Sequence, residues 1–163
     1  MKTKHLLVFV LLILAQCTHA QEHYNFEDVK PAVIEFFKRG AGNPESCDVF
    51  QKQLAKNPKD EQTRKMMIGF CDSDLDTTKP VTFTEMSVHD SEGHPYVCGI
   101  LSGQTQLGRK IGARFIAAEP YHLVLSFKYS RRPIAYATGD GFLVDEYRSQ
   151  VKYFNELYAK ACN

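Results

Sequence analysis

Residues 121–129, YHLVLSFKY, alternate between large apolar side chains and smaller or polar ones. A period of two is typical of a β-strand, in which successive side chains point to opposite faces of a sheet. The set expected to face the core is Tyr121, Leu123, Leu125, Phe127 and Tyr129. The other set runs from His122 to Lys128 and is expected on the opposite face. The segment therefore predicts a half-buried strand.

Three segments before this strand show the same character. Residues 81–88, VTFTEMSV, are rich in Thr and Val, and their apolar phase changes around Glu85, which indicates a β-bulge. Residues 96–101, YVCGIL, and residues 109–118, RKIGARFIAA, follow it. The alternate apolar positions of these two segments are Tyr96, Cys98 and Ile100, and then Ile111, Ala113, Phe115 and Ala117. Short turns between the segments predict an antiparallel meander.

Residues 133–138, PIAYAT, are expected to add a short edge strand, since Pro133 at its start is tolerated there. The meander would then have three to five strands. Residues 139–162 close the chain as a long amphipathic helix. Its apolar stripe consists of Val144, Tyr147, Val151, Phe154, Tyr158 and Ala161. Because such a stripe must be covered, we expect the helix to pack on the apolar face of the sheet.

The N-terminal half is expected to be helical. A first helix is expected over residues 31–39, which begin with Pro31, a residue suited to a first helical turn, and are followed by Gly40. A second helix is expected after Asn43 as N-cap and Pro44, and a third over residues 61–71 with Asp60 as its cap. The sequence thus predicts an α+β fold, with N-terminal helices, an antiparallel meander and a long C-terminal helix.

The first twenty residues are typical of a signal peptide. Lys2 and Lys4 precede the apolar run 6–15, LLVFVLLILA, which as a helix spans only about 15 Å and is too short to cross a bilayer. Thr18 and Ala20 suit a cleavage site. We therefore expect a signal peptide at 1–20, one disulfide-stapled domain at 21–163, and a periplasmic or secreted location, with no transmembrane span.

Cys17 offers a second interpretation of the same segment. LAQC, residues 14–17, resembles the lipobox of bacterial lipoproteins, in which the Cys carries the lipid anchor. The lipobox prefers Gly, Ala or Ser before the Cys, and Gln16 departs from that preference. Cleavage after Ala20 is favoured over a lipid anchor.

Four cysteines remain after the signal peptide: Cys47, Cys71, Cys98 and Cys162. An even number in an exported protein indicates two disulfides, for which three connectivities exist. We expect Cys47–Cys71 to join two helices and Cys98–Cys162 to hold the last helix to the sheet. The spacings of 24, 27 and 64 residues contain no CxxC or Cys–His signature, so no zinc site or other metal is predicted.

The segment 97–115 resembles one found in many small exported bacterial proteins of unknown function, with a V-C-G-x-V-N-x-K-N-x-x-G pattern and a further glycine. The matching residues are Val97, Cys98, Gly99, Gly108 and Gly112, whereas Ser102, Gln104 and Thr105 stand where Asn, Lys and Asn are usual. The resemblance implies an exported envelope protein that contains a sheet, and it brings no assigned activity.

No catalytic pattern stands out, and the protein is predicted not to be an enzyme. Cys98 would need a nearby histidine and a free thiol to act as a nucleophile, and an oxidising compartment favours its disulfide. The acidic residues Asp72, Asp74 and Asp76 fail the EF-hand pattern, because Thr77 replaces its glycine and Phe83 its final glutamate. No cofactor is expected.

The net charge of +1 and the absence of long charge runs argue against nucleic-acid binding. Two basic clusters at strand ends could receive an acidic partner surface: Arg109, Lys110 and Arg114, and then Arg131 and Arg132. The leading hypothesis is a periplasmic protein-binding module, such as an inhibitor or immunity-type protein against an envelope-acting toxin. One alternative is a small-ligand carrier or enzyme with a pocket lined by Phe115, Tyr121 and Phe127. Another is an envelope structural or assembly factor.

Overall fold

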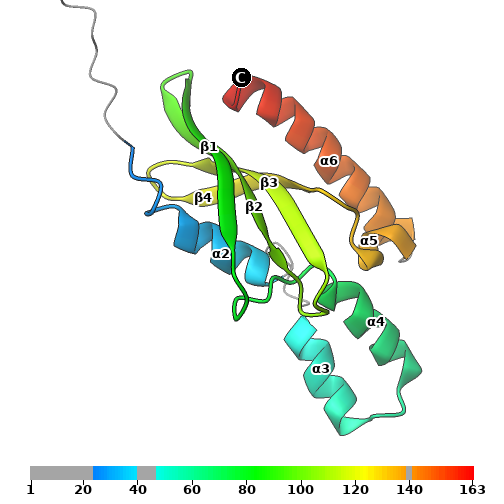
Figure 1. The fold of residues 1–163 in the computed structure, drawn as a ribbon. Helices are drawn as coiled ribbons and strands as arrows, with labels where there is room; N and C mark the ends of the chain where they lie inside the picture. Colours follow the sequence, from blue (N-terminus) through cyan, green and yellow to red (C-terminus); the bar gives the residue numbers. More distant parts are fainter. Residues whose placement is uncertain (1–23, 40–46, 139–140) are drawn as a thin grey trace, which may run out of the picture.

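The computed structural model describes residues 24–39, 47–138 and 141–163. The described part contains helices, a sheet and a long C-terminal helix, as expected for an α+β fold (Figure 1). The helices are α2 (Lys30–Lys38), α3 (Cys47–Lys56), α4 (Glu61–Cys71), α5 (Ile134–Thr138) and α6 (Gly141–Ala161). The strands are β1 (Thr82–Ser91), β2 (His94–Gln104), β3 (Lys110–Ala118) and β4 (Leu123–Tyr129). The predicted signal peptide, Cys17, Asn43 and Pro44 lie outside the described residues.

The sheet is an antiparallel meander with the strand order β1-β2-β3-β4. The bulge predicted in β1 is confirmed, because Thr84 pairs with Ile100 and Ser87 pairs with Cys98. The two intervening residues of β1 therefore oppose a single residue of β2, and Glu85 takes a φ of 52°. The bulge turns Met86 into the core and leaves Glu85 exposed.

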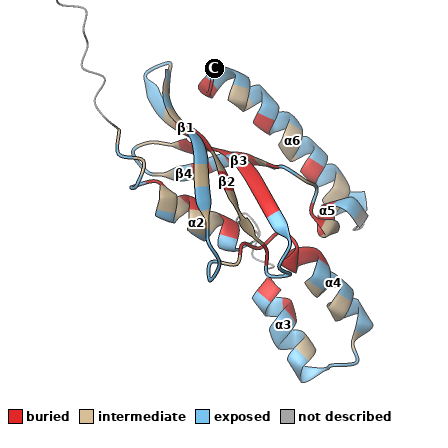
Figure 2. Cartoon of the chain, in the orientation of Figure 1, coloured by how far each residue is buried: buried red, intermediate tan, exposed pale blue. Residues whose placement is uncertain are grey.

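Both faces of the sheet are covered by helices. We call the first the α2 face, because Val33 and Phe37 of α2 pack there in one buried cluster with side chains such as Val97 and Phe115. We call the second the α6 face, because Phe154 of α6 packs there in a cluster with Cys98 and Ile116. Figure 2 shows β3, an inner strand of the meander, buried over much of its length. The prediction of a single apolar face is therefore wrong.

The unbroken alternation predicted for β4 is wrong. Ile116 pairs with Ser126 but Ala117 pairs with Val124, so Leu125 is an extra residue in β4. This irregularity reverses the phase, and Val124 belongs to the core together with Phe127. Three residues expected in the core are exposed instead: Tyr121 by 84%, Leu123 by 59% and Leu125 by 37%.

Residues 133–138 do not form the expected edge strand, because Ile134–Thr138 is the short helix α5. Pro133 suits a helix start as well as a strand edge, and its carbonyl accepts the N–H groups of Tyr136 and Ala137 at 3.1 Å. The N–H of Ile134 donates to the buried carboxylate of Asp72 at 2.9 Å. This distant contact fixes the helical turn.

Two disulfides brace the fold, with the connectivity expected from the sequence. Cys47–Cys71 joins α3 to α4, and Cys98–Cys162 joins β2 to the residue after α6. The second bond lies in the cluster that seats α6 on the sheet. Within the described ranges, no helix has the length and apolar character that a bilayer crossing requires.

Candidate binding groove

Two cations stand directly opposite each other on the α6 face. Arg114 of β3 pairs with Lys128 of β4, and Ile100 of β2 is the neighbour of Arg114 on the other side. Directly opposed residues have Cβ atoms about 5 Å apart, and like charges in such a pair are destabilising. Their arrangement thus opposes the stability of the sheet.

The contacts of these cations compensate little of their charge. Lys128 Nζ donates to the neutral amide oxygen of Asn155 at 3.3 Å. Arg114 Nη2 lies 3.5 Å from Glu85 Oε2, but both side chains are about half exposed or more, at 48% and 64%. Exposed ion pairs of this kind are worth little because water screens them. The Arg114 guanidinium also lies 5.8 Å from the ring centre of Tyr158.

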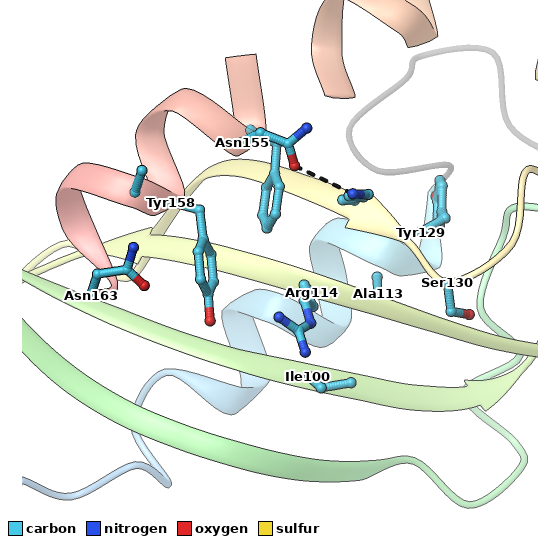
Figure 3. Close-up of a pocket in the computed structure, with 11 residues that line it drawn as sticks. Ile100, Ala113, Arg114, Tyr129, Ser130, Asn155, Tyr158 and Asn163 are labelled. Carbon is cyan, nitrogen blue, oxygen red and sulfur yellow. Dashed lines mark hydrogen bonds between the residues drawn. The ribbon is translucent and has the colours of Figure 1, made fainter. Parts of the chain in front are cut away.

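A groove with a volume of about 500 Å³ opens between these cations and α6 (Figure 3). In Figure 3, Tyr158 points from α6 toward the sheet, and the side chain of Arg114 lies beside its ring. Phe154 and Ile100 add apolar surface, and Tyr129 lies at the β4 end. Burial raises the pKa of Tyr129 well above its usual value, so this phenol stays neutral.

A second hollow of about 460 Å³ continues the first along the sheet, and the two share Ile100 and Ser130. Gly112 lies in the second hollow, and its N–H donates to Ser130 Oγ at 3.1 Å. Ser102 lies next to Gly112 across β2 and β3. A Cβ added at Gly112 would meet both serine hydroxyls, at 3.2 and 3.5 Å. We call the two hollows together the groove.

The electrostatic character of the groove is uniform. Three cations of the described part of the chain line it, namely Lys110, Arg114 and Lys128. No Asp or Glu occurs among the described residues that line either hollow. The arrangement can attract and bind carboxylates or other anions through charge-assisted hydrogen bonds.

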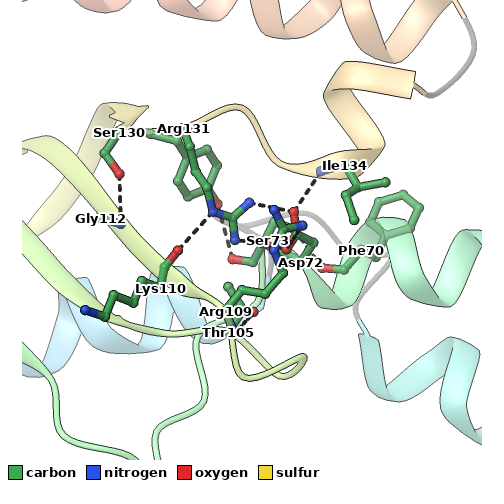
Figure 4. Close-up of polar contacts among 11 residues, drawn as sticks. Phe70, Asp72, Ser73, Thr105, Arg109, Lys110, Gly112, Ser130, Arg131 and Ile134 are labelled. Carbon is green, nitrogen blue, oxygen red and sulfur yellow. Dashed lines mark hydrogen bonds and ion pairs between the residues drawn. The ribbon is translucent and has the colours of Figure 1, made fainter.

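The five basic residues predicted to meet a partner serve different purposes. Arg109 and Arg131 surround the fully buried carboxylate of Asp72, at 3.0 Å from Arg109 Nη1 and 2.6 Å from Arg131 Nη1 (Figure 4). These two arginines therefore satisfy an internal charge. Lys110 and Arg114 line the groove. Arg132 is exposed and lines neither hollow.

The roles of Asp72 and Lys128 could not be predicted from the sequence pattern. Asp72 was considered only as part of an EF-hand pattern that failed, yet its carboxylate binds two arginines and the N–H of Ile134. Lys128 was correctly placed on the face opposite Phe127, but its position beside Arg114 depends on the register of β3 and β4. An alternation pattern carries no information on that register.

The pocket expected from Phe115, Tyr121 and Phe127 is not formed by these residues. Phe115 is fully buried and Phe127 is buried in the core, whereas Tyr121 is 84% exposed. Cys98, considered as a nucleophile, is bonded to Cys162 and 2% exposed. A sulfur atom in a disulfide is not a thiolate nucleophile.

Comparison with known proteins gives no match to a protein family, to a curated protein or to a solved structure. The groove therefore carries the functional argument. Its features are a like-charged pair, a hydroxyl-lined floor and an aromatic wall.

Proposed function

We propose that the protein is an exported, non-catalytic binding module that holds an acidic segment of another protein in the groove. The observation that carries the proposal is the direct pairing of Arg114 with Lys128 beneath α6. Such a pair lowers the stability of the sheet, and an anionic partner would reverse that effect. An inhibitor or immunity-type protein against an envelope-acting toxin is the specific form of this function that we favour.

The bracing of the groove supports a binding function. The disulfide Cys98–Cys162 fixes the end of α6, which forms one wall. A wall that is rigid before binding loses less conformational entropy when the partner arrives. Locking Cys98 in this bond also removes the one thiol that the sequence suggested for catalysis.

Site-specific photo-crosslinking in cells tests this function. A photoreactive residue would replace Ser130 or Ala159, which both line the groove, and in matched controls Lys52 of α3 or Lys65 of α4, which are exposed and line neither hollow. We expect one and the same protein adduct from both groove positions and none from the controls. The adduct should disappear when Arg114→Glu is added.

Two results would contradict the proposal. One is equal crosslinking from the groove and from the α3–α4 controls. The other is the absence of any protein adduct at the groove positions, together with a bound small molecule in the intact mass of the purified protein. That second result would support the small-ligand carrier.

A further inference from the structure

Resting on the function proposed above, we propose that the groove recognises an extended peptide segment with two carboxylates four residues apart. One carboxylate would bind between Arg114 and Lys128, and the other would bind Lys110. The segment would lie along β3, on the α6 face, beside the wall that α6 forms.

The spacing follows from the strand itself. Ile111, Ala113 and Phe115 belong to the core on the α2 face, so Lys110 and Arg114 both point to the α6 face. Four residues of a strand span about 13 Å, and an extended peptide has the same repeat. Carboxylates at positions i and i+4 of the peptide also lie on one face, so both can meet these two cations.

The floor between the two cations is open enough for a peptide. Gly112 lies midway between Lys110 and Arg114 and has no side chain. The hydroxyls of Ser102 and Ser130 flank it. Since Ser130 Oγ accepts the N–H of Gly112, its own O–H can donate to a carbonyl of the ligand. The middle residue of the peptide would rest here.

Arg114 should anchor the peptide more strongly than Lys110, and its contact with Glu85 shows that it can bind a carboxylate. The carboxylate of Glu85 reaches Arg114 Nη2 at 3.5 Å from the exposed bulge of β1. A ligand carboxylate could approach the same guanidinium with two parallel hydrogen bonds, and it would also gain Lys128. Glu85 thus acts as a weak internal competitor for the anion site.

A peptide explains the groove better than an anionic glycan does. The apolar side chains of Ile100, Phe154 and Tyr158 lie at the end that holds Arg114 and Lys128. An apolar residue flanking the first carboxylate would cover this surface. The cations also follow the two-residue repeat of a strand, which an extended peptide shares.

The test uses two synthetic nine-residue peptides of identical composition, both rich in Val and Thr. One carries Glu at its positions three and seven, and the other at positions three and six, which places the second carboxylate on the opposite face. Binding to the purified, oxidised protein is measured by fluorescence anisotropy. We expect the first peptide to bind more tightly, by up to about fivefold, which is the upper limit for one additional exposed ion pair.

Variants separate the contacts. Lys110→Gln should remove the preference for the first peptide, and Arg114→Gln should weaken the binding of both peptides. Glu85→Gln should tighten both, because it removes the competing carboxylate. The matched control is Lys152→Gln, an exposed lysine of α6 outside the groove, which should change neither affinity.

Equal affinity for the two peptides, or an unchanged preference in Lys110→Gln, would overturn the inference. Tighter binding of a sulfated hexasaccharide than of the first peptide would overturn it in favour of a glycan. The proposed function fails separately, because it depends on crosslinking in cells. If crosslinking gives adducts in the groove but the two peptides bind equally, the proposed function is supported and only the spacing of four residues between the carboxylates is refuted.

Discussion

At the residue scale, the pairing of Arg114 with Lys128 should be measurable as lost stability. Lys128→Glu converts a like-charged cross-strand pair into an opposite-charged one. We expect the free energy of unfolding to rise by roughly 0.2–1 kcal/mol, the usual value of such a pair. Urea denaturation of the oxidised protein measures it, with Lys152→Glu as a control that lacks a cross-strand partner.

The same variant should lose its affinity for acidic peptides. A residue that lowers stability and raises affinity is expected at a binding site. If Lys128→Glu instead destabilises the protein, the lysine has a structural role, and the argument from like charges fails.

Asp60 provides a pH-dependent contribution to stability at the start of α4. The N–H and hydroxyl of Thr63 donate to its carboxylate at 3.0 and 2.8 Å, and these hydrogen bonds lower the pKa of Asp60 below its usual 3.8. A carboxyl with a lowered folded pKa stabilises the protein above its unfolded pKa. That contribution disappears as the pH falls through the folded value.

Asp60→Asn keeps the capping interaction but cannot titrate. We therefore expect the variant to lose less stability than the natural protein when the pH falls from neutral to below 3.8. Urea denaturation at a series of pH values measures both proteins. Parallel curves would show that the cap does not carry this pH dependence.

The residue identities alone predicted contacts within an element better than contacts between distant segments. Asp60 was correctly expected as a helix cap, because a cap depends on the next few residues. Asp72 was missed, because its partners Arg109 and Arg131 lie 37 and 59 residues away. Arg109 and Arg131 were accordingly assigned to a partner surface.

At the element scale, the same difference appears in the strands. The bulge in β1 was predicted because it interrupts the alternation around Glu85, as the pairing confirms. The irregularity in β4 was not, because YHLVLSFKY shows continuous alternation and only the pairing with β3 reveals the extra residue. The helix α5 was mistaken for a strand for a related reason, since Asp72 holds its first N–H.

The two disulfides should contribute differently to the free energy of unfolding. The chain-entropy relation gives about 4 kcal/mol for Cys98–Cys162 and about 3 kcal/mol for Cys47–Cys71, whose residues are separated by 64 and 24 positions. Cys98→Ser with Cys162→Ser should therefore lower the free energy of unfolding more than the corresponding pair of changes at Cys47 and Cys71.

Peptide binding should separate the two variants more clearly. Loss of Cys98–Cys162 releases the end of α6, where Tyr158 and Asn163 line the groove, and should weaken binding. Loss of Cys47–Cys71 affects the α3–α4 hairpin, which contributes nothing to the lining among the described residues. Comparable binding defects in both variants, measured where both are folded, would contradict this assignment.

At the scale of the whole molecule, a net charge of +1 hides an uneven charge distribution. From the sequence, this net value argued only against nucleic-acid binding. Folding brings Lys110, Arg114 and Lys128 together on one face. Two other basic side chains, Arg109 and Arg131, form ion pairs with Asp72. An acidic segment therefore meets a local positive potential that the composition does not reveal.

The association rate of an acidic peptide should depend on salt for this reason. The Debye length is about 30 Å at 0.01 M salt and about 10 Å at 0.1 M, and the two outer cations of the groove lie about 13 Å apart along β3. Stopped-flow fluorescence should show the rate falling steeply across this range. The slope should become shallower in Lys128→Gln and stay the same in Lys152→Gln. If the association rate does not depend on salt, the first contact of the peptide is with the apolar surface of Phe154 and Tyr158, and the cations interact with it only afterwards.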